Sequence, residues 1–331
     1  MRRALVLIAA ALVGCGGGGG RGADRPRGAE AAALPFQVLR ARGGQVVSWP
    51  AFIAELAAAD AVCIGEHHPN PHDHWAQLHI LEAVSARTRG AGRSPGLGME
   101  MFQRPFQGVV DDFVAGRIDE AALLSRSAWQ DRWGYDWSLY RPMVLLARTR
   151  GAAILALNTE RELTKKVSRQ GLDKMPAADR ARLPQLVLDD AQHRAWWKNI
   201  MGDMAGAHGH ADSRSRDGTS SPPRSPPEEP DKKPEAETSD SVEERIYAAQ
   251  VLWDETMADG ASKWLAGGPR RHLVILAGNG HCHESAIVRR LERRGVKSAV
   301  SVHPIVDDGE GNVAALLAEP ENDYLFVMSP R

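Results

Sequence analysis

The sequence has little net charge, few cysteines and no long apolar run. Its 331 residues carry a formal net charge of −1, which gives no global electrostatic reason to expect a nucleic-acid partner. No run of about 18 apolar residues is present, so the sequence indicates no transmembrane helix. No internal repeat is found. Hydrophobic residues nevertheless make up 43% of the chain, enough to bury the core of one large domain or two small ones.

One internal segment lacks large apolar side chains altogether. Residues 205–240 contain no Val, Ile, Leu, Met, Phe, Trp, Tyr or Cys. Such a segment cannot bury enough apolar surface to offset the entropy that ordering would cost. The sequence therefore predicts a disordered polar insert over residues 205–240.

The first of the three cysteines belongs to an N-terminal targeting segment. Arg2 and Arg3 precede the apolar residues 4–13, and the run Leu-Val-Gly-Cys ends at Cys15. A basic start, a short apolar core and small residues at the break are typical of a secretory signal. The cysteine at the break makes residues 1–15 resemble a bacterial lipoprotein signal, with Cys15 lipidated after cleavage. The alternative is an ordinary signal peptide with an incidental cysteine.

Lipidation of Cys15 predicts a location in the bacterial cell envelope. Two or more acyl chains hold a protein on a lipid bilayer without a spanning helix. Gly16 follows the cysteine, where aspartate would be the usual signal for retention in the inner membrane, so the outer membrane facing the periplasm is expected. Residues 16–33 are rich in Gly, Ala and Arg and predict a flexible tether. A single domain is expected over residues 34–331.

The other two cysteines lie beside apolar runs in an exported, oxidising setting. Cys63 stands two residues before a glycine that ends one run, and Cys282 stands shortly after another run. We interpret them as two buried, small apolar side chains. A disulfide between neighbouring strand ends is the alternative.

Six apolar runs predict strands, and helical patterns lie between most of them. The runs are residues 61–64, 97–99, 152–157, 273–277, 299–302 and 324–328, the last expected at an edge of the sheet. Residues 36–47 predict a small hairpin or lead-in strand. Alternating strands and helices are typical of a mainly parallel sheet. The expected fold is therefore α/β, a mainly parallel β-sheet flanked by helices in a single domain with the polar insert.

Ionisable side chains directly follow several of these runs. Glu66 and His68 come after the first run, Glu100 after the second, and His281 after the fourth. Because ligands bind at the carboxyl ends of strands in open α/β sheets, we expect these four residues to share a site. His and Glu are the usual ligands of Zn²⁺ and other transition metals. His74 is expected to face the same way from the first turn of the following helix.

Both site histidines stand in the pattern Gly-x-x-His. Gly65 and Gly278 each end an apolar run, three residues before His68 and His281. Glycine gives the backbone room to turn and lets another group approach closely. One such pattern is weak evidence, whereas two with the carboxylates Glu66 and Glu100 indicate a site more specifically.

A cluster of aromatic residues lies in the middle of the chain. Its members are Trp129, Trp133, Tyr135, Trp137 and Tyr140. We interpret them first as packing between helices. The alternative is a wall for a flat apolar ligand, because ring faces stack well on an extended aromatic molecule.

Four motifs occur in order along the chain. It reads I-G-E-x-H-x-N-P-x-x-H-x-x-Q from Ile64, G-M-E-M-F from Gly98, A-Q-x-x-W-D-E-T-M-A from Ala249 and L-A-G-N-G-H as far as His281. This order resembles the ChaN-like haem-binding lipoproteins, which belong to a wider superfamily with the Tiki proteases, the TraB proteins and the erythromycin esterases. The resemblance covers roughly residues 62–303, and the polar insert departs from the family pattern.

The resemblance implies haem as the cofactor and a role in haem or iron uptake without turnover. Haem needs an apolar slot with an axial His or Tyr. The candidates to bind or support the haem iron are His68, His74, Tyr135, Tyr140 and His281. A homodimer that holds haems between its subunits and an outer-membrane haem or iron receptor are the further partners that the resemblance implies.

The same superfamily also implies a metal-dependent hydrolase of the peptidase or esterase type. Glu66, His68, Glu100 and His281 would then be catalytic and would hold a divalent transition metal or activate water. The residues alone do not separate the two readings. The lipoprotein signal and the closest motif match favour haem.

Overall fold

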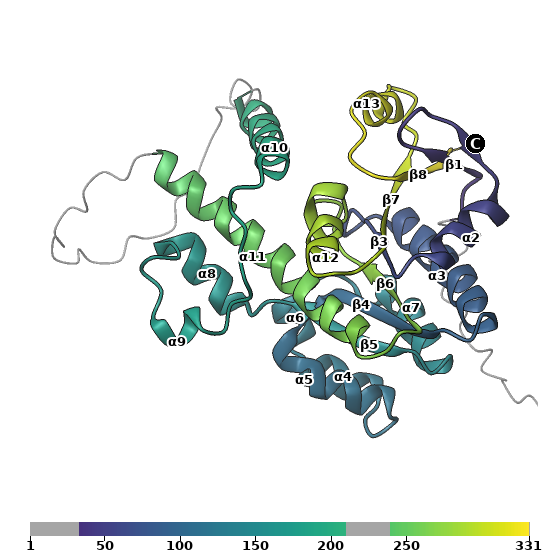
Figure 1. The fold of residues 1–331 in the computed structure, drawn as a ribbon, viewed down its shortest axis with the longest axis horizontal. Helices are drawn as coiled ribbons and strands as arrows, with labels where there is room; N and C mark the ends of the chain where they lie inside the picture. The colour runs from purple at the N-terminus through teal and green to yellow at the C-terminus, as the bar shows by residue number, and fades with distance from the viewer. Residues whose placement is uncertain (1–32, 210–238, 331) are drawn as a thin grey trace, which may run out of the picture.

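The computed structural model describes residues 33–209 and 239–330 (Figure 1). The predicted signal peptide, Cys15 and nearly all of the tether lie outside these residues, as does most of the predicted insert. Helices enter the insert from both ends, because α10 ends at Gly209 and α11 begins at Ser239. The two ends of the predicted insert, residues 205–209 and 239–240, are therefore drawn as helix.

Strands and helices alternate along most of the described chain. The strands are β1 (Phe36–Arg40), β2 (Val46–Val47), β3 (Ala61–Ile64), β4 (Ser94–Gln103), β5 (Ala153–Asn158), β6 (Arg271–Leu276), β7 (Ala299–Val306) and β8 (Tyr324–Met328). The helices before the insert are α2 (Trp49–Ala58), α3 (Pro71–Gly90), η1 (Arg104–Phe106), α4 (Gln107–Val114), α5 (Glu120–Arg126), α6 (Trp129–Arg132), α7 (Trp137–Thr149), α8 (Arg161–Gln170), α9 (Ala177–Arg180) and α10 (Ala191–Gly209). Those after it are α11 (Ser239–Ala266), the π-helical turn η3 (Glu284–Val288), α12 (Arg289–Arg293) and α13 (Asn312–Ala318).

The strands form one sheet in the order β2-β1-β8-β7-β3-β6-β4-β5. Each neighbouring pair from β8 to β5 is parallel, and the hairpin of β1 and β2 joins antiparallel to β8. The mainly parallel α/β sheet is thus confirmed. The expectation that residues 324–328 form an edge strand is wrong, because β1 pairs with β8 along its whole length and covers that edge.

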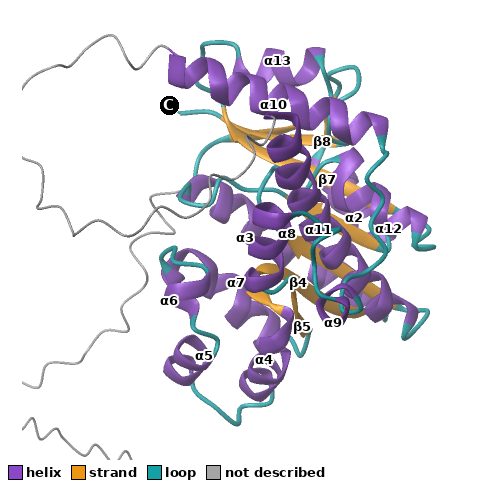
Figure 2. Ribbon diagram, turned by 90° about the vertical axis from the view of Figure 1, so that its left-hand side faces the viewer, coloured by secondary structure: helices purple, strands orange, loops and turns teal. Residues whose placement is uncertain are grey.

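Helices cover both faces of the sheet (Figure 2). Val62 and Ile64 of β3 belong to the core cluster that includes Ile80 of α3, whereas Ala61 belongs to the cluster that includes Met257 of α11. Successive side chains of a strand point to opposite faces, so both faces of β3 are buried. A strand buried on both faces needs apolar side chains at every position, and the sequence Ala-Val-Cys-Ile of β3 has them.

No helix in the described part of the chain is long and apolar enough to cross a lipid bilayer.

Cys63 and Cys282 form a disulfide, with their Cα atoms 5.3 Å apart. The interpretation of two unlinked apolar side chains is therefore wrong, and the alternative is confirmed. The two cysteines are 219 positions apart in sequence. They meet because β3 and β6 are neighbours, which brings the end of β3 beside the turn that follows β6.

We expect the double replacement Cys63→Ala with Cys282→Ala to lower the free energy of unfolding by about 2–5 kcal/mol, because the crosslink restricts the unfolded chain. Urea denaturation of the oxidised protein and of the double variant measures the difference. A reductant should destabilise the wild type by a similar amount and leave the double variant unchanged. Equal stability of the two oxidised proteins would show that the bond does not stabilise the fold.

Candidate functional site

The central strands β3 and β6 are neighbours, so their carboxyl ends lie side by side. The chain leaves these neighbours in opposite directions, since β3 leads to β4 on one side and β6 leads to β7 on the other. Such a switch point opens a crevice beyond the strand ends, where ligands bind in open α/β sheets. Glu100 reaches the same crevice from within β4, which continues to Gln103 with an irregular register after Met99.

Glu66 is buried directly after β3 and organises the first turn. Its Oε1 accepts a hydrogen bond from the Tyr140 hydroxyl at 2.9 Å and lies 2.9 Å from His68 Nδ1. Its Oε2 lies 3.5 Å from His74 Nδ1 and has no hydrogen-bond partner in the described chain. Burial lowers the pKa of His68, but the hydrogen bond to Glu66 and the charges of Glu100 and Glu66 outweigh burial and raise it. His68 therefore donates from Nδ1, and its Nε2 has no hydrogen bond to the described residues.

Helix α3 fixes His74 behind this turn. The helix begins at Pro71 and is capped by Asn70, both of which suit a helix N-terminus. His74 Nε2 donates to the carbonyl oxygen of His68 at 2.7 Å, and its Nδ1 lies 3.2 Å from Gln77 Oε1. Both ring nitrogens are engaged, so His74 supports the turn from below.

His281 lies between two buried carboxylates. Its Nδ1 is 2.6 Å from Asp254 Oδ1 on α11, and its Nε2 is 3.4 Å from Glu100 Oε1. Burial lowers the pKa of His281, but the charges of Glu100 and Asp254 outweigh burial and raise it to about 9. Asp254 also lies 3.1 Å from His193 Nε2 and 3.6 Å from Arg290 Nη1. Burial raises the pKa of Asp254, but Arg290 and the two histidines hold it well below its usual range.

The two glycines of the Gly-x-x-His patterns make room for each other's turns. A Cβ atom on Gly278 would lie 2.9 Å from His68 Cε1, and one on Gly65 would lie 1.9 Å from Asn279 Oδ1. The backbones are also joined, because the Asn279 N–H donates to the carbonyl oxygen of Glu66 at 2.9 Å. The predicted close approach is confirmed, and the group that approaches each glycine belongs to the other pattern.

A cavity of about 580 Å³ opens beside these turns, within the size range of cofactor sites. His68, Glu100 and His281 line it, whereas Glu66 lies enclosed behind His68. The apolar and aromatic part of its wall consists of Trp133, Tyr135, Trp197, Ile246, Ala249 and Trp253. The structure therefore brings the four residues together, with three of them on the cavity surface.

The aromatic cluster is divided between the core and the cavity. Trp129 and Tyr140 are buried in the core, while Trp133 and Tyr135 line the cavity. The ring centroid of His68 lies 4.7 Å from that of Trp133 and 5.0 Å from that of Tyr135. Core packing is thus confirmed for Trp129 and Tyr140, whereas for Trp133 and Tyr135, which line the cavity, a ligand wall stays a prediction. Tyr140, expected as a haem-binding residue, holds Glu66 in place from within the core.

The expected metal site is not formed by the described residues. Within 33–209 and 239–330, no group of three or more His, Cys, Asp or Glu side chains is arranged to hold a metal ion. Oxygen atoms of the two glutamates already have partners. Glu66 contacts Tyr140 and His68, and Glu100 accepts a hydrogen bond from the Gly278 N–H at 2.8 Å.

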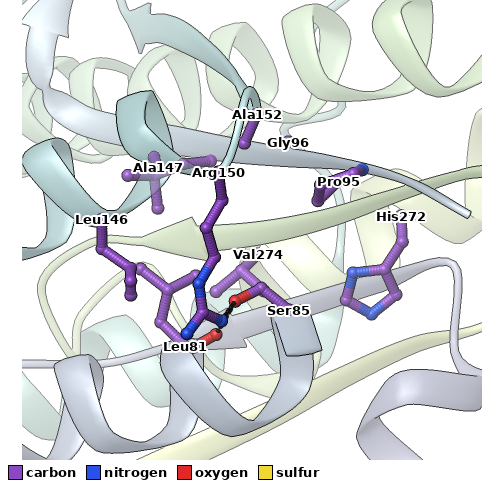
Figure 3. A pocket seen from close by; sticks show the side chains of 11 residues that line it. Leu81, Ser85, Pro95, Gly96, Leu146, Ala147, Arg150, Ala152, His272 and Val274 are labelled. Carbon is purple, nitrogen blue, oxygen red and sulfur yellow. Dashed lines mark hydrogen bonds between the residues drawn. The ribbon is translucent and has the colours of Figure 1, made fainter. Parts of the chain in front are cut away.

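A second, enclosed cavity lies between α3, α7 and the sheet (Figure 3). Its volume is about 10 Å³, room for roughly one water molecule. Arg150 closes part of it by donating to Ser85 Oγ at 2.7 Å. This cavity is too small for an organic ligand.

Sequence reasoning did not identify Asp254, His193 or Arg290 as part of the site. Asp254 stands in the W-D-E-T motif, which could have marked it as a possible site residue but did not indicate which residues it contacts. His193 on α10 and Arg290 on α12 stand in no motif that we identified. Both are fully buried, and only the packing of α10, α11 and α12 brings them to the same carboxylate.

We expect His281 to stabilise the protein more at pH 6 than at pH 9.5. Its pKa rises from an ordinary 6.5 to about 9 on folding, so its contribution is complete below about pH 6.5 and is lost as pH rises through about 9. At pH 6, His281→Gln should lower the free energy of unfolding by about 3 kcal/mol or more, because Asp254 and Glu100 lose their shared cation. Urea denaturation at both pH values measures the effect.

His272→Gln is the matched control for this test. Burial lowers the pKa of His272 to about 4, so this histidine is neutral at both pH values. Because the unfolded histidine still has its ordinary pKa of 6.5, it binds protons at pH 6 and the folded one does not, so His272→Gln should cost slightly less at pH 6 than at pH 9.5, the opposite sign to His281→Gln. A His281→Gln effect that is independent of pH, or that has the same sign as the His272→Gln effect, would contradict the charged pairing.

Comparisons with known proteins give a matching family model and similar solved structures. A family model described as haem-binding uptake, Tiki superfamily, ChaN matches residues 52–291. The structure titled as cofacial haem binding to ChaN of Campylobacter jejuni is similar over 89% of this chain and 97% of that chain, with a TM-score of 0.62 and 16% identity. No curated protein sequence gives a significant match.

Two further solved structures are more weakly similar. The type III effector HopBA1 has a TM-score of 0.42 and 11% identity, with 91% of this chain and 98% of that chain covered. An erythromycin esterase, EreC, in its open conformation has a TM-score of 0.40 and 12% identity, with 90% and 83% covered. The family match spans well over half of the sequence and confirms the resemblance of the four motifs. The chain therefore belongs to the ChaN family of haem-binding uptake proteins in the Tiki superfamily.

Proposed function

We propose that this protein binds haem in the cavity at the carboxyl edge of the sheet. The observation that carries the proposal is a single wall that combines His68, Tyr135 and Trp133. Haem requires an apolar slot and an axial His or Tyr, and this wall offers both. Membership of the ChaN family supports the same ligand.

The residues present fit a tetrapyrrole. The cavity of about 580 Å³ is within the size range of cofactor sites, and Trp253 on α11 lines it together with Trp133 and Tyr135. Aromatic side chains favour contact with the faces and edges of another ring system. His281 also lines the cavity, but both of its ring nitrogens face carboxylates. We therefore do not propose it as a ligand of the haem iron.

His68 and Tyr135 are the two candidate iron ligands. A metal-bound histidine commonly donates its other N–H to a carboxylate, which fixes the orientation of the ring. Glu66 Oε1 accepts that N–H from His68, and the Tyr140 hydroxyl donates to the same oxygen. The Tyr135 side chain is 36% exposed, and its hydroxyl has no hydrogen bond to the described residues. Haem supplies an iron with axial positions, and these residues would hold and orient it.

The proposed setting is the bacterial cell envelope. Residues 1–15 resemble a lipoprotein signal, so the mature chain would be anchored through Cys15, on the outer membrane and facing the periplasm. A tether over residues 16–33 would separate the domain from the bilayer. In that setting the protein would take part in haem or iron uptake, receive haem from an outer-membrane receptor, and hold haem as a homodimer.

We expect added hemin to produce a defined Soret band that is altered by His68→Ala or Tyr135→Phe. Loss of an axial ligand should also weaken hemin binding by roughly tenfold or more, by analogy with the loss of supporting groups around metals. Glu66→Gln should shift the band less, because it changes only the group that orients His68. Absorbance titration of the purified protein measures each effect.

His79→Gln and Tyr324→Phe are matched controls, since neither residue lines the cavity. Both should bind hemin as the wild type does. If the wild type does not bind hemin above the level of an unrelated protein, haem binding is wrong. If it binds and all cavity variants behave like the controls, the haem lies elsewhere.

The membrane anchor is tested separately with Cys15→Ser. We expect this variant to accumulate unprocessed or to leave the membrane fraction, because it cannot be acylated. Cell fractionation followed by intact mass measurement distinguishes these outcomes. A variant that is processed and fractionates like the wild type would rule out lipidation at this position.

A further inference from the structure

We propose that Arg161 and Lys165 on α8 form an anion site at the mouth of the cavity that binds the carboxylate groups of a tetrapyrrole. The inference rests on the proposed haem function and extends it, because it assigns the polar end of the ligand to residues of this chain. It also predicts the orientation of the ligand, with its carboxylates toward α8 and its apolar body against the aromatic wall.

The lining of the cavity is divided by chemistry. One part is aromatic and apolar. It includes Trp133 and Tyr135, between α6 and α7, together with Ile246 and Trp253 on α11. The part contributed by β5, α8 and the short segment between them is polar. It consists of Asn158, Thr159, Arg161, Thr164, Lys165 and Ser168. A ligand that is apolar over most of its surface and anionic at one edge complements both parts.

Two cations on α8 are available to such a ligand. Lys165 and Arg161 are both exposed, one turn apart on the same helix. The Lys165 ammonium group has no hydrogen bond or ion pair with any described residue, and the acidic side chain that it affects by charge is Glu162, whose pKa it helps to lower. The Arg161 guanidinium donates only from Nη1, to the carbonyl oxygen of Asp131 at 2.7 Å, which positions it over the cavity and leaves its other donors free within the described chain.

The neighbouring charges do not cancel this site. Arg132 also lines the cavity, but its guanidinium is 2.5 Å from Glu162, so these two neutralise each other. Glu100 lies at the floor, where its Oε2 accepts the Gly278 N–H at 2.8 Å. Asp131 is the acidic side chain at the rim, and a single carboxylate leaves the pair of α8 cations in excess.

The chemistry of haem supplies the matching anion. A tetrapyrrole of the haem type carries two propionate groups on one edge of an otherwise apolar ring. Arg and Lys both bind carboxylates by charge-assisted hydrogen bonds, and Arg can do so with two parallel bonds. Because these cations are exposed, each contact should contribute modestly and should be weakened by salt.

The experiment compares hemin with its dimethyl ester, in which both propionates are neutral. The full-length protein in a mild detergent is titrated with each compound, and the ratio of the two dissociation constants is measured. We expect the wild type to prefer hemin and the double variant Arg161→Gln with Lys165→Gln to lose about three- to tenfold of that preference, mainly through weaker hemin binding. Comparing ratios between proteins cancels the partition of each compound into detergent.

Two further variants keep the test specific. Arg169→Gln removes an exposed cation from the same helix outside the cavity lining and should leave the ratio unchanged. Arg161→Lys keeps the charge and should retain most of the preference. The Soret band of the double variant should match that of the wild type, because the iron ligands are untouched.

The outcomes separate the two proposals. If the wild type binds neither compound, the haem function itself fails. If the wild type binds hemin and the double variant keeps the wild-type ratio, haem binds without this anchor and the inference is overturned. A loss of preference in Arg169→Gln equal to that of the double variant would also overturn it, because the effect would then come from overall charge.

Discussion

The close approach of two turns, one after β3 and one after β6, is the constraint on which the cavity depends. Gly278 admits the ring of His68, and Gly65 admits the side chain of Asn279. The disulfide between Cys63 and Cys282 joins the same two segments covalently. Any side chain at either glycine would push a histidine or an amide out of place, so both Gly-x-x-His patterns specify a contact between two strands rather than a local turn alone.

The second constraint is the burial of the carboxylates of Glu66, Glu100 and Asp254 near the carboxyl ends of the central strands. An unpaired buried carboxylate is strongly unfavourable, so each needs a cation or a hydrogen-bond donor. Glu66 has Tyr140 and His68, and Asp254 has His281 with Arg290 behind it. These pairings fix the two cavity histidines in different roles. Among the residues that the structure describes, His68 Nε2 has no hydrogen-bond partner, whereas both ring nitrogens of His281 face carboxylates.

This difference underlies the proposal that the iron ligand comes from the wall that holds His68 and not from His281. His68 Nε2 and the Tyr135 hydroxyl, which have no hydrogen bond within the described chain, belong to the wall that also carries Trp133. In the described chain the four residues chosen for a metal are not arranged to hold one. Glu66, Glu100 and His281 pair with neighbouring side chains or the backbone and support the turns, whereas His68 pairs through Nδ1 alone. Whether a His or Glu side chain can bind a metal or instead supports the backbone depends on which neighbouring groups already occupy its nitrogen or oxygen atoms.

The sequence alone determined the class of fold and the positions of the two turns. Apolar runs such as 61–64 and 273–277 are local signals, and the polar or glycine residues that end them mark the strand ends. Local patterns do not indicate the order of the strands in the sheet. For this reason β8 was wrongly expected at an edge, and the pairing of Cys63 stayed open. Asp254, His193 and Arg290 meet only because three helices pack over one face, and no spacing in the chain records that contact. Tertiary structure therefore decided which ionisable groups are paired and buried and which remain free, because pairing depends on neighbours far apart in the sequence.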